Sequence, residues 1–251
     1  MPRTLISAFL ALAITPALAS AQAWQGRVLL GVNGAVQPAS NTYEDDFTYQ
    51  HPYSGNIPGE AASVSTRYDI PAGIVVDGGI AVRLFGNLGA GVSFSHWSDT
   101  DDMAISARIP HPFFVGRHRE VQGTETARHA ETGTHVQVLY IIPAGEHLYF
   151  GISGGPSYFN VEQQIIEAVN TTETYPYDTA EFASGDLQTL KQGGWGFNAG
   201  VDLGWMFTRN FGIGGLLRYS RATVSLEPSG RDARDIDAGG LQAGAGIRLA
   251  F

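Results

Sequence analysis

The chain has 251 residues, a formal net charge of −9 and no cysteine. The acidic balance argues against a nucleic-acid partner, because nucleic-acid binding needs a basic surface. The absence of cysteine excludes a disulfide framework and a thiolate metal site. Glycine occurs 32 times, nearly twice its ordinary share, whereas charged residues make up only 16% of the chain.

The N-terminus has the form of a secretory signal peptide. A short positive region, Met1-Pro2-Arg3, precedes an apolar stretch over 5–14. Small residues then offer cleavage sites after Ala19, Ala21 or Ala23. We therefore expect residues 1–23 to be a signal peptide and residues 24–251 to form one exported domain.

Beyond residue 23, the sequence repeatedly alternates large apolar residues with small or polar ones. No segment there approaches the roughly 18 consecutive apolar residues of a transmembrane helix, and the mean hydropathy is −0.04. Period-two alternation instead predicts β-strands. Eight such strands follow in chain order, over 24–37, 73–85, 88–97, 132–142, 148–158, 193–207, 211–220 and 240–251.

The connections between these strands alternate in length. Short turns are expected at 86–87, 143–146 and 208–210. Long loops are expected near 38–72, 99–130 and 162–192, with a shorter one near 227–236. Short turns at one end and long loops at the other, on an even number of antiparallel strands, are typical of an outer-membrane β-barrel.

The bulk of the apolar side chains decides which face points outward. A water-soluble barrel with the apolar face inside is the main alternative, but an eight-stranded barrel has little room inside. The strand over 193–207 alone would place Trp195, Phe197, Leu203, Trp205 and Phe207 in that space. We therefore expect an up-and-down transmembrane barrel, with glycine and polar groups inside and apolar side chains facing lipid.

The C-terminus alternates in the same way, with Ile247, Leu249 and Phe251 as its last outward residues. With this ending, the chain resembles the eight-stranded barrels typified by the transmembrane domain of outer-membrane protein A. The resemblance implies residence in the outer membrane of a Gram-negative envelope, contact with its lipid and lipopolysaccharide, and recognition of the terminal residues by the barrel-assembly machinery. It implies no cofactor.

Several polar residues share the inward face of the predicted strands. Because buried charges are costly unless paired, we expect Asp77 and Asp202 to lie within a network of arginines. Such a network would plug the barrel; the alternative is a narrow gated path for ions or small solutes. The expected lumen residues are Arg27, Asp77, Arg83, Asn198, Asp202, Arg218, Gln242 and Arg248.

One pair of residues resembles a catalytic arrangement. His96 and Ser98 lie two apart on the predicted outer face, as in the lipid A deacylases of the outer membrane. That resemblance would make His96 the base and Ser98 the nucleophile, with Asp99 or Glu131 orienting the histidine. A polar pair where a strand leaves the bilayer is the simpler interpretation, so no enzymatic activity is the principal expectation.

The predicted long loops contain most of the remaining histidines and acids. His111, His118, His129 and His135 lie in or beside the second loop, but their spacings match no metal motif. The sequence therefore predicts a structural or surface-interaction role, with an extracellular ligand contacting the loops at 38–72, 99–130 and 162–192. A small-solute channel and a lipid A-modifying hydrolase are the two alternatives.

Overall fold

The computed structural model describes residues 26–38, 42–51 and 60–251. The expected signal peptide, residues 1–23, lies outside the described residues. The described part of the chain contains no helix that is long and apolar enough to cross a membrane. Its strands are β1 (Val28–Gln37), β2 (Thr42–Tyr49), β3 (Ala62–Asp69), β4 (Gly73–Phe85), β5 (Leu88–Pro110), β6 (His118–Ala144), β7 (Leu148–Glu173), β8 (Ala180–Met206), β9 (Phe211–Leu226) and β10 (Arg234–Ala250).

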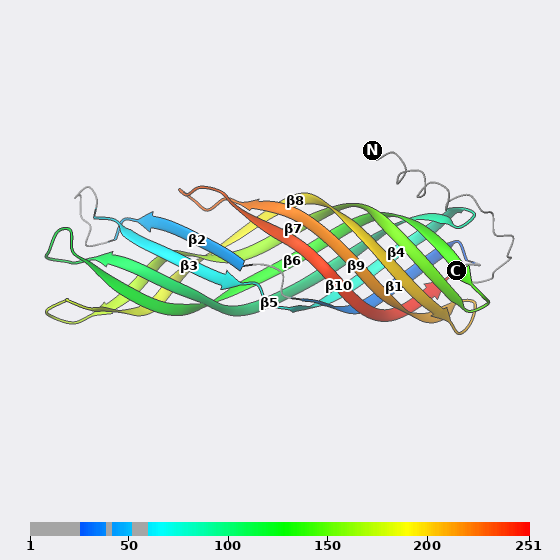
Figure 1. Ribbon diagram of the computed structural model, residues 1–251, viewed down its shortest axis with the longest axis horizontal. Helices are drawn as coiled ribbons and strands as arrows, with labels where there is room; N and C mark the ends of the chain where they lie inside the picture. The colour runs from blue at the N-terminus through cyan, green and yellow to red at the C-terminus, as the bar shows by residue number, and fades with distance from the viewer. Residues whose placement is uncertain (1–25, 39–41, 52–59) are drawn as a thin grey trace, which may run out of the picture.

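Eight of these strands form a closed antiparallel ring. The order β1-β4-β5-β6-β7-β8-β9-β10 returns to β1 through pairs from Leu29↔Ala250 to Val36↔Ala243. The fold is therefore the predicted eight-stranded up-and-down barrel, which Figure 1 shows from the side with its long axis horizontal. Closure leaves no exposed strand edge in this part of the barrel, as a membrane-spanning sheet requires.

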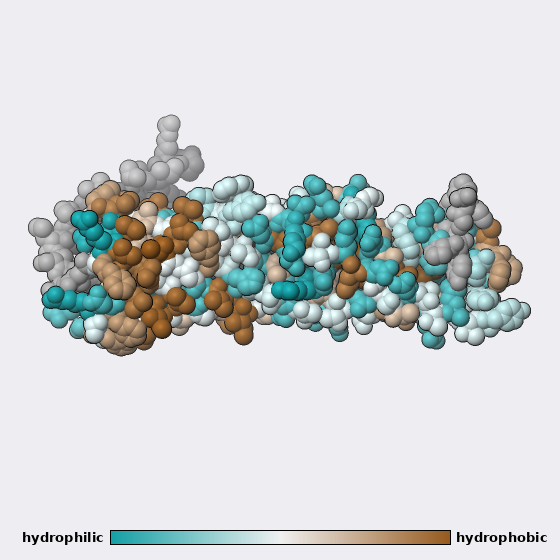
Figure 2. Space-filling view, turned by 180° about the vertical axis from the view of Figure 1, so that it is seen from behind, coloured by the Kyte–Doolittle hydropathy of each residue, from teal (hydrophilic) through white to brown (hydrophobic). Residues whose placement is uncertain are grey.

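The end of the barrel with the short turns carries apolar side chains outside. On β7, Phe150 and Ile152 point outward, whereas Tyr149 and Gly151 are buried. The same alternation holds on β8, where Trp195, Phe197 and Val201 are exposed and Asn198 is buried. The exposed apolar side chains gather at one end of the molecule, as one face of it shows in Figure 2. We call this surface the apolar belt, and its place around a closed barrel makes it a lipid-facing surface.

Farther along the same strands the polarity is reversed. On β7, the buried residues become Phe159, Val161 and Ile165, while Asn160 is exposed. On β5, Met103 and Ile105 are likewise buried between exposed small or polar residues. These inward side chains form one apolar core, which we call the extension core, and the surface around it is mostly hydrophilic (Figure 2). The barrel thus continues beyond the lipid as a water-exposed extension.

This extension corrects the prediction of long irregular loops. The segment expected as a loop over 99–130 is mostly β-hairpin, since β5 and β6 stay paired from Leu88↔Tyr140 to Pro110↔His118. The segment over 162–192 belongs to β7 and β8, which pair out to Glu173↔Ala180. Within 38–72, β2 and β3 form a further hairpin that joins the sheet through β3 and β5.

Trp97, the last residue of the predicted strand over 88–97, points into the barrel. It is buried and lies 5.2 Å from the ring of His129, measured between centroids. Phe94 and His96 occupy the outward positions on this strand. The aromatic girdle at the loop end is represented by the Tyr158–Trp195 edge-to-face pair, with ring centroids 5.1 Å apart.

The reversal of polarity can be tested on the outward face of β7. Ile152 lies in the middle of the apolar belt, whereas Asn160 lies on the same face above the Tyr158 girdle. Ile152→Arg should lower the free energy of unfolding by about 2–4 kcal/mol, because it places a charge near the bilayer midplane. Asn160→Arg should leave it nearly unchanged. Urea unfolding in lipid vesicles measures both, and equal effects would show that the belt does not end at Tyr158.

Candidate functional site

Polar side chains meet inside the barrel within the apolar belt. Arg218 on β9 contacts Asp77 on β4, with 2.7 Å between the guanidinium nitrogen and the carboxylate oxygen. The same guanidinium donates to Gln242 Oε1 at 2.6 Å and to Ser93 Oγ at 3.0 Å. The second oxygen of Asp77 accepts from Asn33 Nδ2 at 2.9 Å. Both charged side chains are almost fully buried.

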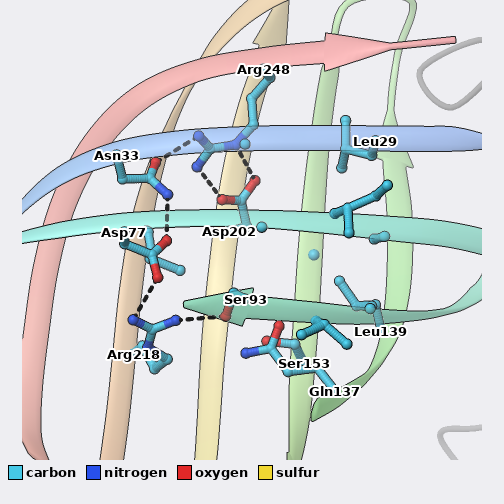
Figure 3. A pocket seen from close by; sticks show the side chains of 18 of the residues that line it. Leu29, Asn33, Asp77, Ser93, Gln137, Leu139, Ser153, Asp202, Arg218 and Arg248 are labelled. Atoms are coloured by element: carbon cyan, nitrogen blue, oxygen red, sulfur yellow. Dashed lines mark hydrogen bonds and ion pairs between the residues drawn. The ribbon is translucent and has the colours of Figure 1, made fainter. Parts of the chain in front are cut away.

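A second ion pair joins this one through Asn33. Arg248 on β10 contacts both carboxylate oxygens of Asp202 on β8, and it donates to Asn33 Oδ1 at 2.6 Å. Figure 3 shows the two pairs as one connected group, with Asn33 between Asp77 and Arg248. We call this group the lumen network. Two arginines and two aspartates give it no net charge, as the cost of burying isolated charge requires.

The sheet register explains how distant residues converge there. Asn33 pairs with Asp77 across β1 and β4, and Gly31 pairs with Arg248 across β1 and β10. All these side chains occupy the inward positions of their strands, so closing the ring brings them to one interior. Glycines on the same face leave the space that the guanidinium groups occupy: a Cβ at Gly214 would meet Arg248 at 2.9 Å.

Asn198 belongs to a separate inward group. Its side chain accepts from Gln137 Nε2 at 2.9 Å and donates to Ser157 Oγ at 2.8 Å. His135 lies between Ser157, at 2.8 Å, and Ser95, at 3.0 Å. This group continues the polar interior toward the extension core, where His135 meets Phe159 edge to face with ring centroids 5.5 Å apart.

Two arginines expected in the lumen lie elsewhere. Arg27 is exposed at the short-turn end, next to the start of β1. Arg83 is half-buried near the end of β4, and its Nε donates to the carbonyl of Gly86 in the adjoining turn at 2.7 Å. Both arginines lie at the short-turn end of the barrel. At this end, inward-facing side chains are no longer enclosed by the surrounding strands.

A cavity of about 90 Å³ adjoins the lumen network. Its walls combine network residues with the apolar Leu29 and Leu139 (Figure 3). Tyr149 also lines it. At roughly 10–15 Å³ for each water, it has room for several waters. Ile141, Tyr149, Met206 and Ala250 pack together on its short-turn side. On the other side, the polar interior gives way to the extension core.

The structure places the histidines of the predicted second loop in different environments. His129 and His135 are fully buried inside the barrel, whereas His111 is buried at the distal end beside the 111–117 turn. His129 lies 3.0 Å from Glu131 and 2.7 Å from Gln163. The second Glu131 oxygen accepts from the amide of Gly239 at 2.8 Å. Among the described residues, no group of three His, Asp or Glu side chains has the arrangement of a metal site.

His96 and Ser98 both lie on the exposed outer face of β5. The hydrogen-bond partner of His96 is Thr132 on the neighbouring strand, with 2.9 Å between Nδ1 and Oγ1. Glu131, one of the two residues expected to orient the histidine, is buried and directed into the barrel. Asp99 instead accepts a hydrogen bond from the backbone amide of Thr100 at 2.7 Å.

Several members of the interior groups are not among the lumen residues predicted from the sequence. Ser93 and Gln37 are hydrogen-bonded to Arg218 and Gln242, respectively, and His135 joins Ser95 to Ser157. All of them occupy inward positions of alternating strands, so strand parity was the signal that could have found them. Strand parity does not predict which inward residues contact one another, because those contacts depend on the register between neighbouring strands around the ring.

The C-terminal residues close the ring. Phe251 and Val28 exchange two backbone hydrogen bonds, at 2.9 and 3.0 Å. Phe251 and Ile247 are exposed on the outer face, and Leu249 is half-buried between them. Their recognition by the assembly machinery stays a prediction.

Buried tyrosines in the extension make its stability depend on alkaline pH. Burial, together with Asp101 and Asp99, raises the pKa of Tyr68 from 10.0 to about 12. An unfolded chain ionises this phenol near pH 10, whereas the folded chain does not. The stabilisation is therefore fully present below pH 10 and is lost as pH rises through 12. Unfolding midpoints measured from pH 9 to 12 should fall, and Tyr68→Phe should reduce that fall; an unchanged slope would contradict this role.

Comparison with known proteins finds similarity only among solved structures. No family model and no curated protein matches the chain. Among solved structures, the outer-membrane protein OprG of Pseudomonas aeruginosa matches with a TM-score of 0.52 and 11% identity, over 92% of this chain and 99% of that one. Ail of Yersinia pestis, solved with the heparin analogue sucrose octasulfate, matches with a TM-score of 0.42 and 12% identity, over 89% and 99%. The match to OprG and the closed ring of eight strands show that the chain has the fold of the eight-stranded outer-membrane β-barrels.

Proposed function

We propose that this chain is an integral outer-membrane protein whose filled barrel supports an extracellular extension for interaction at the cell surface. The observation that carries the proposal is the division of the molecule into two parts. Around the lumen network the exterior is apolar, and around the extension core it is hydrophilic. One closed sheet thus anchors in lipid and displays a compact, water-exposed end.

The filled interior supports an anchoring role over a channel. Arg218 on β9 crosses the lumen to Asp77 on β4 and Ser93 on β5. Arg248 on β10 pairs with Asp202, two strands away on β8. Apolar side chains pack toward both ends of this network. A solute passing through would have to separate the buried Asp77–Arg218 pair and the partly buried Asp202–Arg248 pair, and displace part of the extension core. Our proposal therefore assigns the cavity of about 90 Å³ to bound water rather than to a transport path.

Our proposal also assigns no lipid hydrolysis to His96 and Ser98. A serine nucleophile needs a base within hydrogen-bond reach, and the His96 imidazole is hydrogen-bonded to Thr132 instead. Incubation of the folded barrel with lipid A, followed by mass spectrometry, tests this assignment. Release of acyl chains that is lost in His96→Ala would establish the hydrolase.

Planar-bilayer recording separates the anchor from the channel. Detergent-extracted protein should first show the shift in gel migration on boiling that identifies a folded barrel. The folded protein should then give no defined conductance steps, and Asp202→Ala should unfold more easily. Stable steps in the wild type, or steps in Asp202→Ala without loss of stability, would favour the channel over our proposal.

A further inference from the structure

The distal end of the extension carries exposed apolar side chains. In the turn over 111–117, Phe113, Phe114 and Val115 are 68, 55 and 70% exposed, and Tyr175 in the turn over 174–179 is 80% exposed. Together with the half-exposed Tyr177, we call these residues the tip cluster. Figure 2 shows a small apolar group at the end opposite the apolar belt, with a hydrophilic surface between. Apolar side chains grouped on an otherwise polar surface mark an interaction site.

The tip cluster is held in place by contacts between its two turns. Phe113 meets Tyr177 edge to face, with ring centroids 5.5 Å apart, and Tyr175 meets Tyr177 at 6.0 Å. Beneath them, His111 packs on Phe114 with centroids 4.8 Å apart. The buried Arg119 donates to the carbonyl of Tyr177 at 3.2 Å, which ties the second turn to β6. Because these contacts order the side chains in advance, little conformational entropy is lost when they bind a partner.

Two ion pairs lie at the tip cluster. Arg117 contacts Asp178 at 3.0 Å, which joins the two turns. Arg119 contacts Glu173 at 2.8 Å, and both side chains are buried. Charge patterns across an interface set the specificity and register of docking between proteins. Charges that neutralise each other inside one partner do not supply such a pattern, and they favour an uncharged apolar partner.

The tip cluster lies too far from the bilayer that holds the barrel to contact it. About 15 residues of β7 separate the Tyr158 girdle from Glu173 at the strand end. At a rise of about 3.3 Å per residue and a tilt near 45°, they span roughly 35 Å along the barrel axis. The tip cluster therefore stands far above the lipid that surrounds the apolar belt, where it meets whatever faces the cell surface.

We propose that the tip cluster inserts into the headgroup region of a second lipid bilayer that faces the outer membrane. Phenylalanine, tyrosine and valine on projecting turns suit this region, where aromatic rings lie at the boundary between water and hydrocarbon. A lipid surface also needs no matching charge pattern. This inference rests on the proposed surface role and names the partner of the extension as a neutral lipid surface.

Vesicle flotation tests the inference with the barrel held in nanodiscs, so that the apolar belt is already covered. Wild-type protein should float with phosphatidylcholine vesicles, and Phe113→Ser/Phe114→Ser/Val115→Ser should lower the partition coefficient at least tenfold. Leu187→Ser, which alters a less exposed apolar residue on β8, is the control and should bind like the wild type. The fluorescence of Y175W should shift to shorter wavelength when vesicles are added.

Three outcomes would overturn the inference. The wild type could fail to float, or the triple variant could float as well as the wild type. Alternatively, flotation could occur only with anionic vesicles and be abolished by salt. Binding to natural membrane vesicles that trypsin treatment removes would identify a protein partner instead. Each of these results can occur with a folded, non-conducting barrel, so the inference can fail while the proposed function stands.

Discussion

Asp77→Ala is expected to lower the free energy of unfolding of the barrel by about 3–5 kcal/mol, because it leaves Arg218 buried without its counter-charge. Gln242 and Ser93 still accept from the guanidinium, but neither neutralises it. Urea unfolding of the protein in lipid vesicles measures the change. We expect the same direction for Asp202→Ala, which removes the partner of Arg248.

The control for Asp77→Ala is an ion pair of the same kind on the surface. Arg67 contacts Glu44 at 2.7 Å, with both side chains largely exposed. Glu44→Ala should cost no more than about 1 kcal/mol, since solvent screens such pairs. Asp77→Leu/Arg218→Met should recover part of the loss, because it removes both buried charges. A loss of less than about 1 kcal/mol for Asp77→Ala would show that the network does not hold the barrel together.

Phe159→Ala should lower the free energy of unfolding by about 3–5 kcal/mol, the usual cost of truncating a buried phenylalanine. Phe159 is buried in the extension core, where it packs against His135. The loss should appear in the extension, so hydrogen exchange of β5 and β7 amides beyond the Tyr158 girdle should accelerate. Measurement by mass spectrometry distinguishes the extension from the belt.

Asn160→Ala is the matched control for Phe159→Ala, because Asn160 is the next residue on β7 and points outward. It should change the unfolding free energy by no more than about 0.5 kcal/mol. If Phe159→Ala were as mild as this control, the distal strands would not share a packed core. They would then behave as the independent loops that the sequence suggested.

The alternation predicts the strands of the apolar belt correctly but does not predict their continuation into the extension. This difference has a physical cause. Within the apolar belt, one face of each strand is large and apolar and the other is glycine or polar, as in Trp195-Gly196-Phe197, and this contrast identifies a strand. In the extension, Met103 and Ile105 alternate with small or polar residues beside the acids Asp99 to Asp102. These acids favour a solvated loop, although the alternation of a strand is also present. Acids on the outer face of a strand in water are compatible with β-structure, and this explains the error.

The sequence predicts which residues face the candidate site but not which of them pair with each other. Parity placed Asp77, Asp202, Arg218 and Arg248 inside the barrel, and the cost of buried charge made pairing necessary. The pairs Asp77–Arg218 and Asp202–Arg248 depend on the stagger of eight strands, which no single strand encodes. Arg27 and Arg83 have the same parity but lie at strand ends, where enclosure stops.

The sequence by itself determined the strands of the apolar belt, their inward and outward faces, and the closed barrel they form, because alternation of side-chain size is a local property of each strand. Only the tertiary structure decided that the strands continue beyond the lipid with reversed polarity, that the two ion pairs meet through Asn33, and that two distant turns assemble the tip cluster. These features arise between residues far apart in the chain, and closing the ring brings them together.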